Sequence, residues 1–138
     1  LKDKIDPYLA PWYESLHELL PENKIQNLLD RGIIEIIPLA YMRGRTINRS
    51  AMILDEAQNA SSIQMKMFLT RLGIESRAII TGDASQIDLP TKSNSGLIDV
   101  LKILKNINDI GIVELSEHDI ARHHLVKHII SAYSKSSK

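Results

Sequence analysis

Apolar residues recur at helical spacing along residues 1–32 of the chain. Leu16, Leu19 and Leu20 share one face of a first predicted helix, and the same spacing returns at Ile25 and Leu28. Prolines fall near the starts or breaks of these segments, and a glycine follows the second segment as a stop signal. The pattern therefore predicts two consecutive amphipathic helices.

Beyond residue 32, short apolar runs alternate with longer segments of helical periodicity. The apolar runs predict β-strands at residues 33–37, 51–57, 77–83 and 111–115. The helical pattern returns at residues 61–73, 94–107 and 118–133. Ser61 and Gln64 have the spacing of a capping box at the start of one of these helices. Met65, Met67 and Phe68 follow on that helix and are expected to lie in the core.

This alternation of strands and helices predicts an α/β domain in which helices flank a parallel sheet. The runs at 51–57 and 77–83 look like core strands, so we expect them to be buried neighbours. The chain contains no internal repeat and no linker of biased composition. We therefore predict one domain over residues 1–133, opening with the helical segment 1–32, and a disordered tail at 134–138.

Composition narrows the classes of function. The chain has 138 residues, a formal net charge of +0 and no cysteine. Thiol catalysis, thiolate metal sites and disulfides are thereby excluded, and no overall field attracts nucleic acid or an anionic membrane. No signal peptide or membrane-spanning run is evident, which favours the cytoplasm. Leu1 stands where a complete chain would begin with Met, which favours a processed chain or a fragment.

Two adjacent carboxylates, Asp55 and Glu56, follow the run AMIL, and Asp83 follows the run AIITG. Ligands of open α/β sheets bind beyond the carboxyl ends of the strands, so these three side chains are expected to gather at one rim. Mg²⁺ is the natural compensating charge, because it takes oxygen ligands. The plainer alternative is a pair of strands that end in solvated loops, and the repetition at a second strand end favours the magnesium site. Further polar side chains expected at this rim are Gln58, Asn59, Thr81 and Gln86.

Five motifs, taken together in their order along the chain, resemble the PhoH family. The segment ILDEAQN looks like a Walker B motif in its DEAQ form, and TGDASQIDLP looks like the strand-end motif that follows it in helicase-related P-loop proteins. The other three motifs are PLAYMRGRT, QMKMFLTRLG and SGLIDVLKIL, and the resemblance covers nearly the whole chain. It implies a helicase-like P-loop NTPase fold and Mg²⁺-dependent binding and hydrolysis of ATP. It also implies a link to RNA metabolism or to the phosphate-starvation response.

The resemblance assigns roles to individual residues. Asp55 would hold Mg²⁺ through water, and Glu56 would orient or deprotonate the attacking water. Gln86 would sense the γ-phosphate or polarise the same water. Asp83 would support the metal shell, and Thr81 would hydrogen-bond within it. Such oxygen-rich side chains suit phosphoryl transfer, which needs mainly positioning and charge neutralisation.

A P-loop enzyme also needs the motif G-x-x-x-x-G-K-S/T, which cradles the phosphates, and no glycine of this chain begins it. The resemblance places that motif upstream, so the chain is expected to be the C-terminal part of a PhoH domain, truncated on its N-terminal side. We therefore expect this chain alone neither to bind ATP tightly nor to hydrolyse it. Loss of an upstream strand would expose a sheet edge, which predicts self-association, as a homo-oligomer, or marginal stability.

Arginines suggest a second class of function. Arg43 and Arg45 flank Gly44, and two guanidinium groups on a tight bend can clamp phosphate, either of ATP or of RNA. A solvated turn is the alternative. Arg122 matches a family arginine that would act as an arginine finger or sensor on a neighbour's nucleotide, or would be an ordinary charge near a helix start. The rival to the ATPase interpretation is thus a non-hydrolysing module that binds RNA or a protein partner through Arg43 and Arg45.

Histidines and aromatic residues carry weaker signals. His124 and His128 share a helical face, but no third ligand stands at a fixed spacing, which disfavours a metal site. Tyr8, Trp12 and Tyr13 cluster on the first predicted helix. Stacking on single-stranded nucleic acid would suit them, although their periodicity favours plain packing.

Overall fold

The computed structural model describes residues 9–89 and 95–116, together with positions 119, 121, 125, 126, 128, 129, 132 and 133. The chain divides into two compact units. The first unit comprises the described residues within Leu1–Leu54 and Lys66–Ile80. The second comprises those within Asp55–Met65 and Thr81–Lys138. The prediction of one domain over 1–133 stays a prediction.

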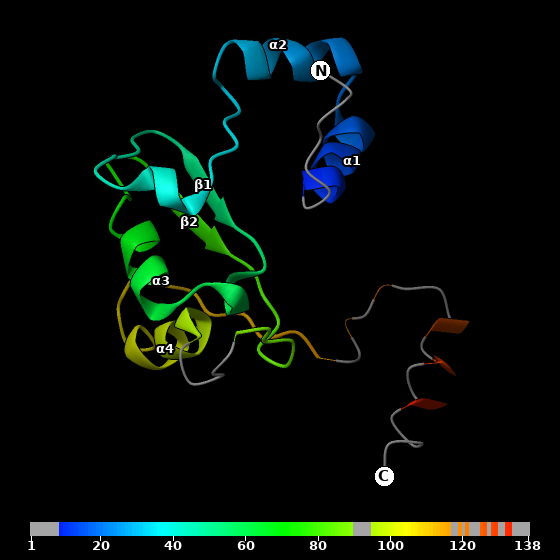
Figure 1. The fold of residues 1–138 in the computed structure, drawn as a ribbon, viewed down its shortest axis with the longest axis vertical. Coiled ribbons are helices and arrows are strands. Elements are labelled where there is room, and N and C mark those ends of the chain that lie inside the picture. The colour runs from blue at the N-terminus through cyan, green and yellow to red at the C-terminus, as the bar shows by residue number, and fades with distance from the viewer. Residues whose placement is uncertain are drawn as a thin grey trace. The chain divides into compact units, whose positions relative to one another are not determined.

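Helices and strands alternate along the described residues (Figure 1). In chain order the α-helices are α1 (Ala10–Leu19), α2 (Glu22–Asp30), α3 (Ser62–Leu69) and α4 (Gly96–Ile103). The strands are β1 (Ala51–Leu54) and β2 (Arg77–Ile80), and the 3₁₀ turns are η3 (Leu39–Met42) and η4 (Ala57–Asn59). No helix within these described residues is long and apolar enough to cross a membrane.

The two predicted N-terminal helices are confirmed as α1 and α2. Pro11 lies in the first turn of α1, where a missing N–H costs nothing, and Pro21 occupies the N-cap of α2. Gly32 follows the C-cap of α2 with a φ of +63°, a conformation that glycine adopts without strain. Trp12 and Tyr13 are half-buried on α1, while Tyr8 lies outside the described residues.

A two-stranded parallel sheet forms the centre of the first unit, which confirms the predicted neighbours. β1 and β2 pair in parallel, with Ala51 opposite Arg77 and Leu54 opposite Ile80. One face packs on a core of Met42, Met52 and Phe68, which receives the second half of α3. The expected core position of this helix is thus confirmed for Phe68 and, in the second unit, for Met65, whereas Met67 is half-buried.

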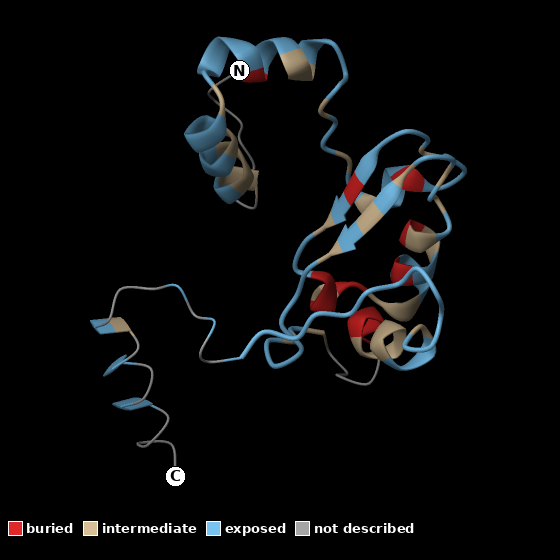
Figure 2. Cartoon of the chain, turned by 180° about the vertical axis from the view of Figure 1, so that it is seen from behind, coloured by how far each residue is buried: buried red, intermediate tan, exposed pale blue. Residues whose placement is uncertain are grey.

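The other face of this sheet corrects the prediction of fully buried strands. Burial alternates along both strands, and Figure 2 shows the alternation in colour. Ile53 and Ile79 lie opposite each other and are 46% and 48% exposed. The physical reason is the period of a strand, which turns successive side chains to opposite faces, so one covered face buries only every second residue.

The loops before β1 and β2 are joined by backbone hydrogen bonds. Ile47 N–H donates to Arg71 O at 2.8 Å, and Gly73 N–H donates to Ile47 O at 2.9 Å. Asn48 Oδ1 accepts the N–H of Ile74 at 2.9 Å. A Cβ on Gly73 would lie 2.0 Å from that same oxygen, so only glycine permits this approach. These contacts set the register of the sheet at the amino ends of its strands.

The second unit is organised by η4, the start of α3 and α4. The predicted capping box is confirmed, because Ser61 N–H donates to Gln64 Oε1 at 2.8 Å and Gln64 N–H donates to Ser61 Oγ at 3.3 Å. α4 packs against η4, and the Ser95 hydroxyl, which is fully buried, donates to Gln58 O at 2.8 Å. Ser62 on α3 also donates a hydrogen bond to Asp99 on α4.

Two strand predictions are wrong. Residues 33–37 are irregular and lead into η3, because Ile33 and Ile34 donate their N–H groups to Leu28 O at the end of α2. Those donors are therefore not available for a strand ladder. Residues 111–115 are also irregular, and Val113 is 83% exposed, because no described strand pairs with this segment. Half of the predicted last helix, residues 118–133, lies outside the described residues. Within it, positions 125, 126, 128, 129, 132 and 133 are helical.

Candidate functional site

Asp55 and Thr81 are the residues that follow β1 and β2. The parallel register pairs the last residues of the two strands, so the chain leaves the sheet at neighbouring positions. The Thr81 hydroxyl donates to Asp55 Oδ1 at 2.5 Å, and the N–H of Ala57 donates to Thr81 O at 3.0 Å. Both side chains belong to the second unit and are exposed. The prediction that these strand ends meet is confirmed by this contact.

Glu56 has an unusual backbone. Its φ of +50° and ψ of +36° lie in the left-handed region, which is uncommon for a residue with a Cβ and often marks functional sites. Gln58 donates from Nε2 to Glu56 Oε2 at 2.5 Å. The Glu56 side chain is exposed, whereas Gln58 is only 1% exposed. The exposed Glu56 carboxylate thus accepts a hydrogen bond from the buried Gln58 amide.

Asp83 and Gln86 belong to a loop that follows β2 and folds on itself. Asp83 Oδ1 accepts hydrogen bonds from Ser85 N–H at 2.8 Å and from Ser85 Oγ at 2.6 Å. Asp83 Oδ2 accepts a hydrogen bond from Gln86 Nε2 at 2.6 Å. The bonds from the Ser85 side chain and backbone, and then that from Gln86, lower the pKa of Asp83 below its ordinary value.

The prediction that Asp55, Glu56 and Asp83 gather at one rim stays a prediction, and the described side chains do not form a shared metal-binding group. No group of three or more histidine, cysteine, aspartate or glutamate side chains that could hold a metal ion occurs within residues 9–89, 95–116 and the isolated described positions. The physical reason is that both Asp83 oxygens are engaged by its own loop, while Asp55 bonds to Thr81. The roles assigned to Asp83 and Gln86 stay predictions.

Asp55 nevertheless fits a magnesium ion carried by a nucleotide. Thr81 engages Oδ1, and no hydrogen bond reaches Asp55 Oδ2 within the described part of the chain. In nucleotide sites Mg²⁺ is held by one or two carboxylates, by substrate phosphates and by several waters, rather than by a cage of protein ligands. The exposed Asp55 carboxylate, which accepts a hydrogen bond from Thr81, is one ligand of the kind that such an arrangement uses.

The predicted arginines belong elsewhere in the chain. Arg43 and Arg45 lie in the first unit, where Gly44 between them has a φ of +79°. Arg45 forms an exposed ion pair with Glu35 at 2.9 Å. Arg122 lies outside the described residues. The structure therefore brings together Asp55 and Thr81, Glu56 and Gln58, and Asp83 and Gln86, all within the second unit.

Sequence reasoning placed Gln58 and Asn59 near the rim without giving them a task. Gln58 Oε1 accepts the N–H of Asp83 at 3.1 Å, and Asn59 Oδ1 accepts the N–H of Asp88 at 2.9 Å. Two consecutive amides on η4 thus tie down both ends of the loop that carries Gln86. The available signal was the pair of amides next to a carboxylate pair in the run DEAQN.

Comparison with known proteins agrees with the resemblance in the sequence. The family model described as PhoH-like protein matches residues 1–134. A PhoH-like protein of Bacillus subtilis (strain 168) is 56% identical over 137 residues, which cover 99% of this chain and 43% of the relative. A PhoH-like protein of Synechocystis sp. is 47% identical over 136 residues, covering 99% of this chain and 42% of the relative.

A more distant relative is Protein PhoH of Escherichia coli (strain K12), which is 43% identical over 136 residues, covering 97% of this chain and 38% of the relative. The chain thus spans less than half the length of these curated relatives. The family match extends over nearly every residue, including the segments that carry Asp55, Glu56 and Asp83. The chain belongs to the PhoH-like protein family.

Proposed function

We propose that this chain supplies the magnesium-binding and water-activating side of an ATP-hydrolysing site in its complete gene product. The observation that carries the proposal is the contact between Asp55 and Thr81 at the ends of two parallel strands, with Glu56 next in the chain. Strand ends of this kind are where α/β proteins bind nucleotides. The proposal includes a helicase-like P-loop fold for the complete domain and a location in the cytoplasm.

The described side chains suit three tasks in hydrolysis. Asp55 would hold Mg²⁺ through water, and the ion, when bound, would neutralise the developing phosphate charge. Glu56 would orient a water molecule and accept its proton at a carboxylate oxygen. Gln86 donates one N–H of Nε2 to Asp83 Oδ2, and the second N–H of the same amide would be the donor to a γ-phosphate. Thr81 would keep Asp55 in one orientation.

Replacing Asp55 with asparagine tests the magnesium role. In the complete gene product, the Mg²⁺ concentration that gives half-maximal ATP hydrolysis is expected to rise about 10- to 100-fold, as for other partners that act on a metal through its outer shell. The measurement is a Mg²⁺ titration of steady-state hydrolysis at saturating ATP. Asp109→Asn is the matched control, because Asp109 is exposed and asparagine tolerates its φ of +68°. Absence of Mg²⁺-dependent hydrolysis by the unaltered gene product would overturn the proposal.

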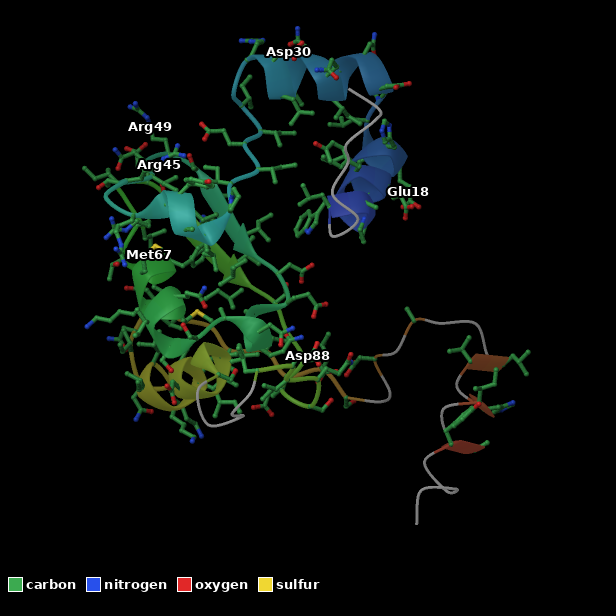
Figure 3. The ribbon with its side chains drawn as sticks, in the orientation of Figure 1. Glu18, Asp30, Arg45, Arg49, Met67 and Asp88 are labelled. Atoms are coloured by element: carbon green, nitrogen blue, oxygen red, sulfur yellow. The ribbon has the colours of Figure 1, made fainter. Side chains whose placement is uncertain are left out.

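A second candidate function, RNA binding, is favoured by one feature of the first unit. The linked loops before β1 and β2, together with the first residue of β2 (residues 43–50 and 71–77), carry five arginines and one glutamate, although the whole chain has a formal net charge of +0. The arginines are Arg43, Arg45, Arg49, Arg71 and Arg77. Figure 3 shows Arg45 and Arg49 at the same end of this unit. Guanidinium groups bind phosphate bidentately, so this surface suits the phosphates of a nucleic-acid backbone. RNA binding there would be consistent with the proposed link of the family to RNA metabolism or to the phosphate-starvation response.

Salt dependence tests this second candidate. If Arg43 and Arg45 each neutralise one phosphate, the double variant Arg43→Ala plus Arg45→Ala is expected to flatten the slope of log binding constant against log salt by about 1.4. The measurement is fluorescence anisotropy of a labelled single-stranded RNA titrated with this chain. Arg31→Ala is the control, because Arg31 follows α2 and lies outside the two loops. An unchanged slope in the double variant would count against RNA binding at this surface.

A further inference from the structure

Gln58 is a buried polar side chain at the candidate site, whereas Asp55, Glu56, Thr81 and Asp83 are exposed. It is 1% exposed, and a buried amide is costly unless its polar atoms find partners. Its Nε2 donates to Glu56 Oε2 at 2.5 Å, and its Oε1 accepts the N–H of Asp83 at 3.1 Å. One side chain thus bonds the carboxylate after β1 and the backbone of the loop after β2.

The surroundings fix this amide in place. The backbone oxygen of Gln58 accepts a hydrogen bond from the buried Ser95 hydroxyl at 2.8 Å. A Cβ on Gly82 would lie 2.6 Å from Gln58 Oε1 and 3.2 Å from Ala57 N, so the loop passes closely over the amide only because glycine stands there. A side chain that is hydrogen-bonded at both its amide nitrogen and its amide oxygen has few alternative rotamers. The groups bonded to it are therefore also restricted in orientation.

Asn59 extends the same connection along the loop. Its Oδ1 accepts the N–H of Asp88 at 2.9 Å, while Gln58 accepts the N–H of Asp83. The segment between these two points carries Gln86, which bonds to Asp83 Oδ2 at 2.6 Å. The turn that positions the Glu56 carboxylate therefore also holds both ends of the loop of Gln86.

We infer that Gln58 is a positioning residue for hydrolysis: it orients the Glu56 carboxylate and locks it in register with the loop that carries Gln86. This inference rests on the proposed function, because it acts through the base that Glu56 provides. Gln58 Nε2 bonds to the carboxylate that the proposed function expects to meet the water. Charge-assisted hydrogen bonds of this kind are short and fix geometry.

Gln58→Met is the informative variant, because methionine has similar length and bulk and makes neither amide bond. In the complete gene product, kcat for ATP hydrolysis is expected to fall about 10- to 100-fold, the usual effect of losing an orienting partner. KM for ATP is expected to stay near its original value, since the Gln58 side chain is buried and therefore not exposed to a ligand. Gln64→Met is the matched control on the capping box, with kcat unchanged.

A double-mutant cycle separates positioning from general damage. In a Glu56→Gln background, Gln58→Met is expected to lower kcat far less than in the unaltered protein, because the base it orients is already absent. The same factor of loss in both backgrounds, or no loss in Gln58→Met, would overturn the positioning role and leave the proposed function intact. Full activity in Glu56→Gln itself would overturn both.

Hydrogen exchange on this chain gives a readout that needs no ATP. In Gln58→Met the amide of Asp83 loses its acceptor, so its exchange is expected to accelerate, whereas Gln64→Met should leave it unchanged. If Gln58→Met does not fold, Gln58→Glu keeps an acceptor for the Asp83 amide, removes the donor to Glu56 and places a second carboxylate beside it, so kcat is expected to fall at least as far. A Gln58→Glu variant with unchanged kcat, or an unchanged Asp83 exchange rate in Gln58→Met, would contradict the inferred connection.

Discussion

Replacing Glu56 with glutamine is expected to lower kcat for ATP hydrolysis by the complete gene product about 10²- to 10⁴-fold, the range for loss of a general base. Glutamine keeps the shape of the side chain and its place beside Gln58 but cannot accept a proton. Binding of ATP should persist, because the phosphates and Mg²⁺ are held by other groups in the proposal. The measurement is steady-state hydrolysis together with the affinity for a fluorescent ATP analogue.

Glu75 provides a matched control for this experiment. It is exposed and also has a positive φ of +58°, but it lies in the loop before β2. Glu75→Gln repeats the change in charge and the unusual backbone without touching the candidate site, so kcat should not change. A Glu56→Gln variant that retains the kcat of the unaltered protein would remove Glu56 from the reaction.

The elements that sequence predicted correctly are those specified by local chemistry. The capping box at Ser61 and Gln64 needs only neighbouring residues, and it forms as expected. Prolines stand in the first turn of α1 and at the N-cap of α2. Gly32 follows the end of α2 because its positive φ favours glycine. β1 and β2 are short apolar runs separated by a segment of helical periodicity, which is the connection that a parallel pair requires, so their pairing was also accessible.

The elements that sequence missed depend on partners at a distance. Residues 33–37 and 111–115 have the composition of strands, but a strand is stabilised by the ladder it joins and not by composition alone. At residues 33–37 the end of α2 takes the N–H groups of Ile33 and Ile34 instead. Residues 111–115 have no described neighbour to pair with. Nothing in the pattern of apolar residues distinguishes these runs from β1.

The candidate site was predictable to the level of its strand ends. The rule that ligands bind beyond the carboxyl ends of parallel strands predicted Asp55 and Thr81 near one another, and they bond directly. The rule could not reveal the orientation of Asp83, because a carboxylate in a loop also bonds nearby backbone and side chains, here those of Ser85 and Gln86. The bridge made by Gln58 was likewise hidden, since it depends on the depth of burial of one amide.

Replacing Met65 with alanine is expected to lower the free energy of unfolding of this chain by about 2–5 kcal/mol, the range for truncating a buried methionine. Met65 is 1% exposed. A Cβ on Gly96, at the start of α4, would lie 2.6 Å from the Met65 Cβ, so α3 and α4 are in close contact there. Truncation would leave a cavity that such a tight contact cannot easily close. The measurement is urea unfolding followed by far-UV circular dichroism at one fixed protein concentration.

Ile63→Ala is the control on the same helix. Ile63 is 78% exposed, so its truncation removes little packing, and alanine is a good helix former. Its free energy of unfolding should therefore stay within about 0.5 kcal/mol of the unaltered chain. Equal effects of the two substitutions would mean that burial of the Met65 side chain contributes little to stability. A large loss confined to Met65→Ala would show that burial of the Met65 side chain between α3 and its neighbours stabilises this chain.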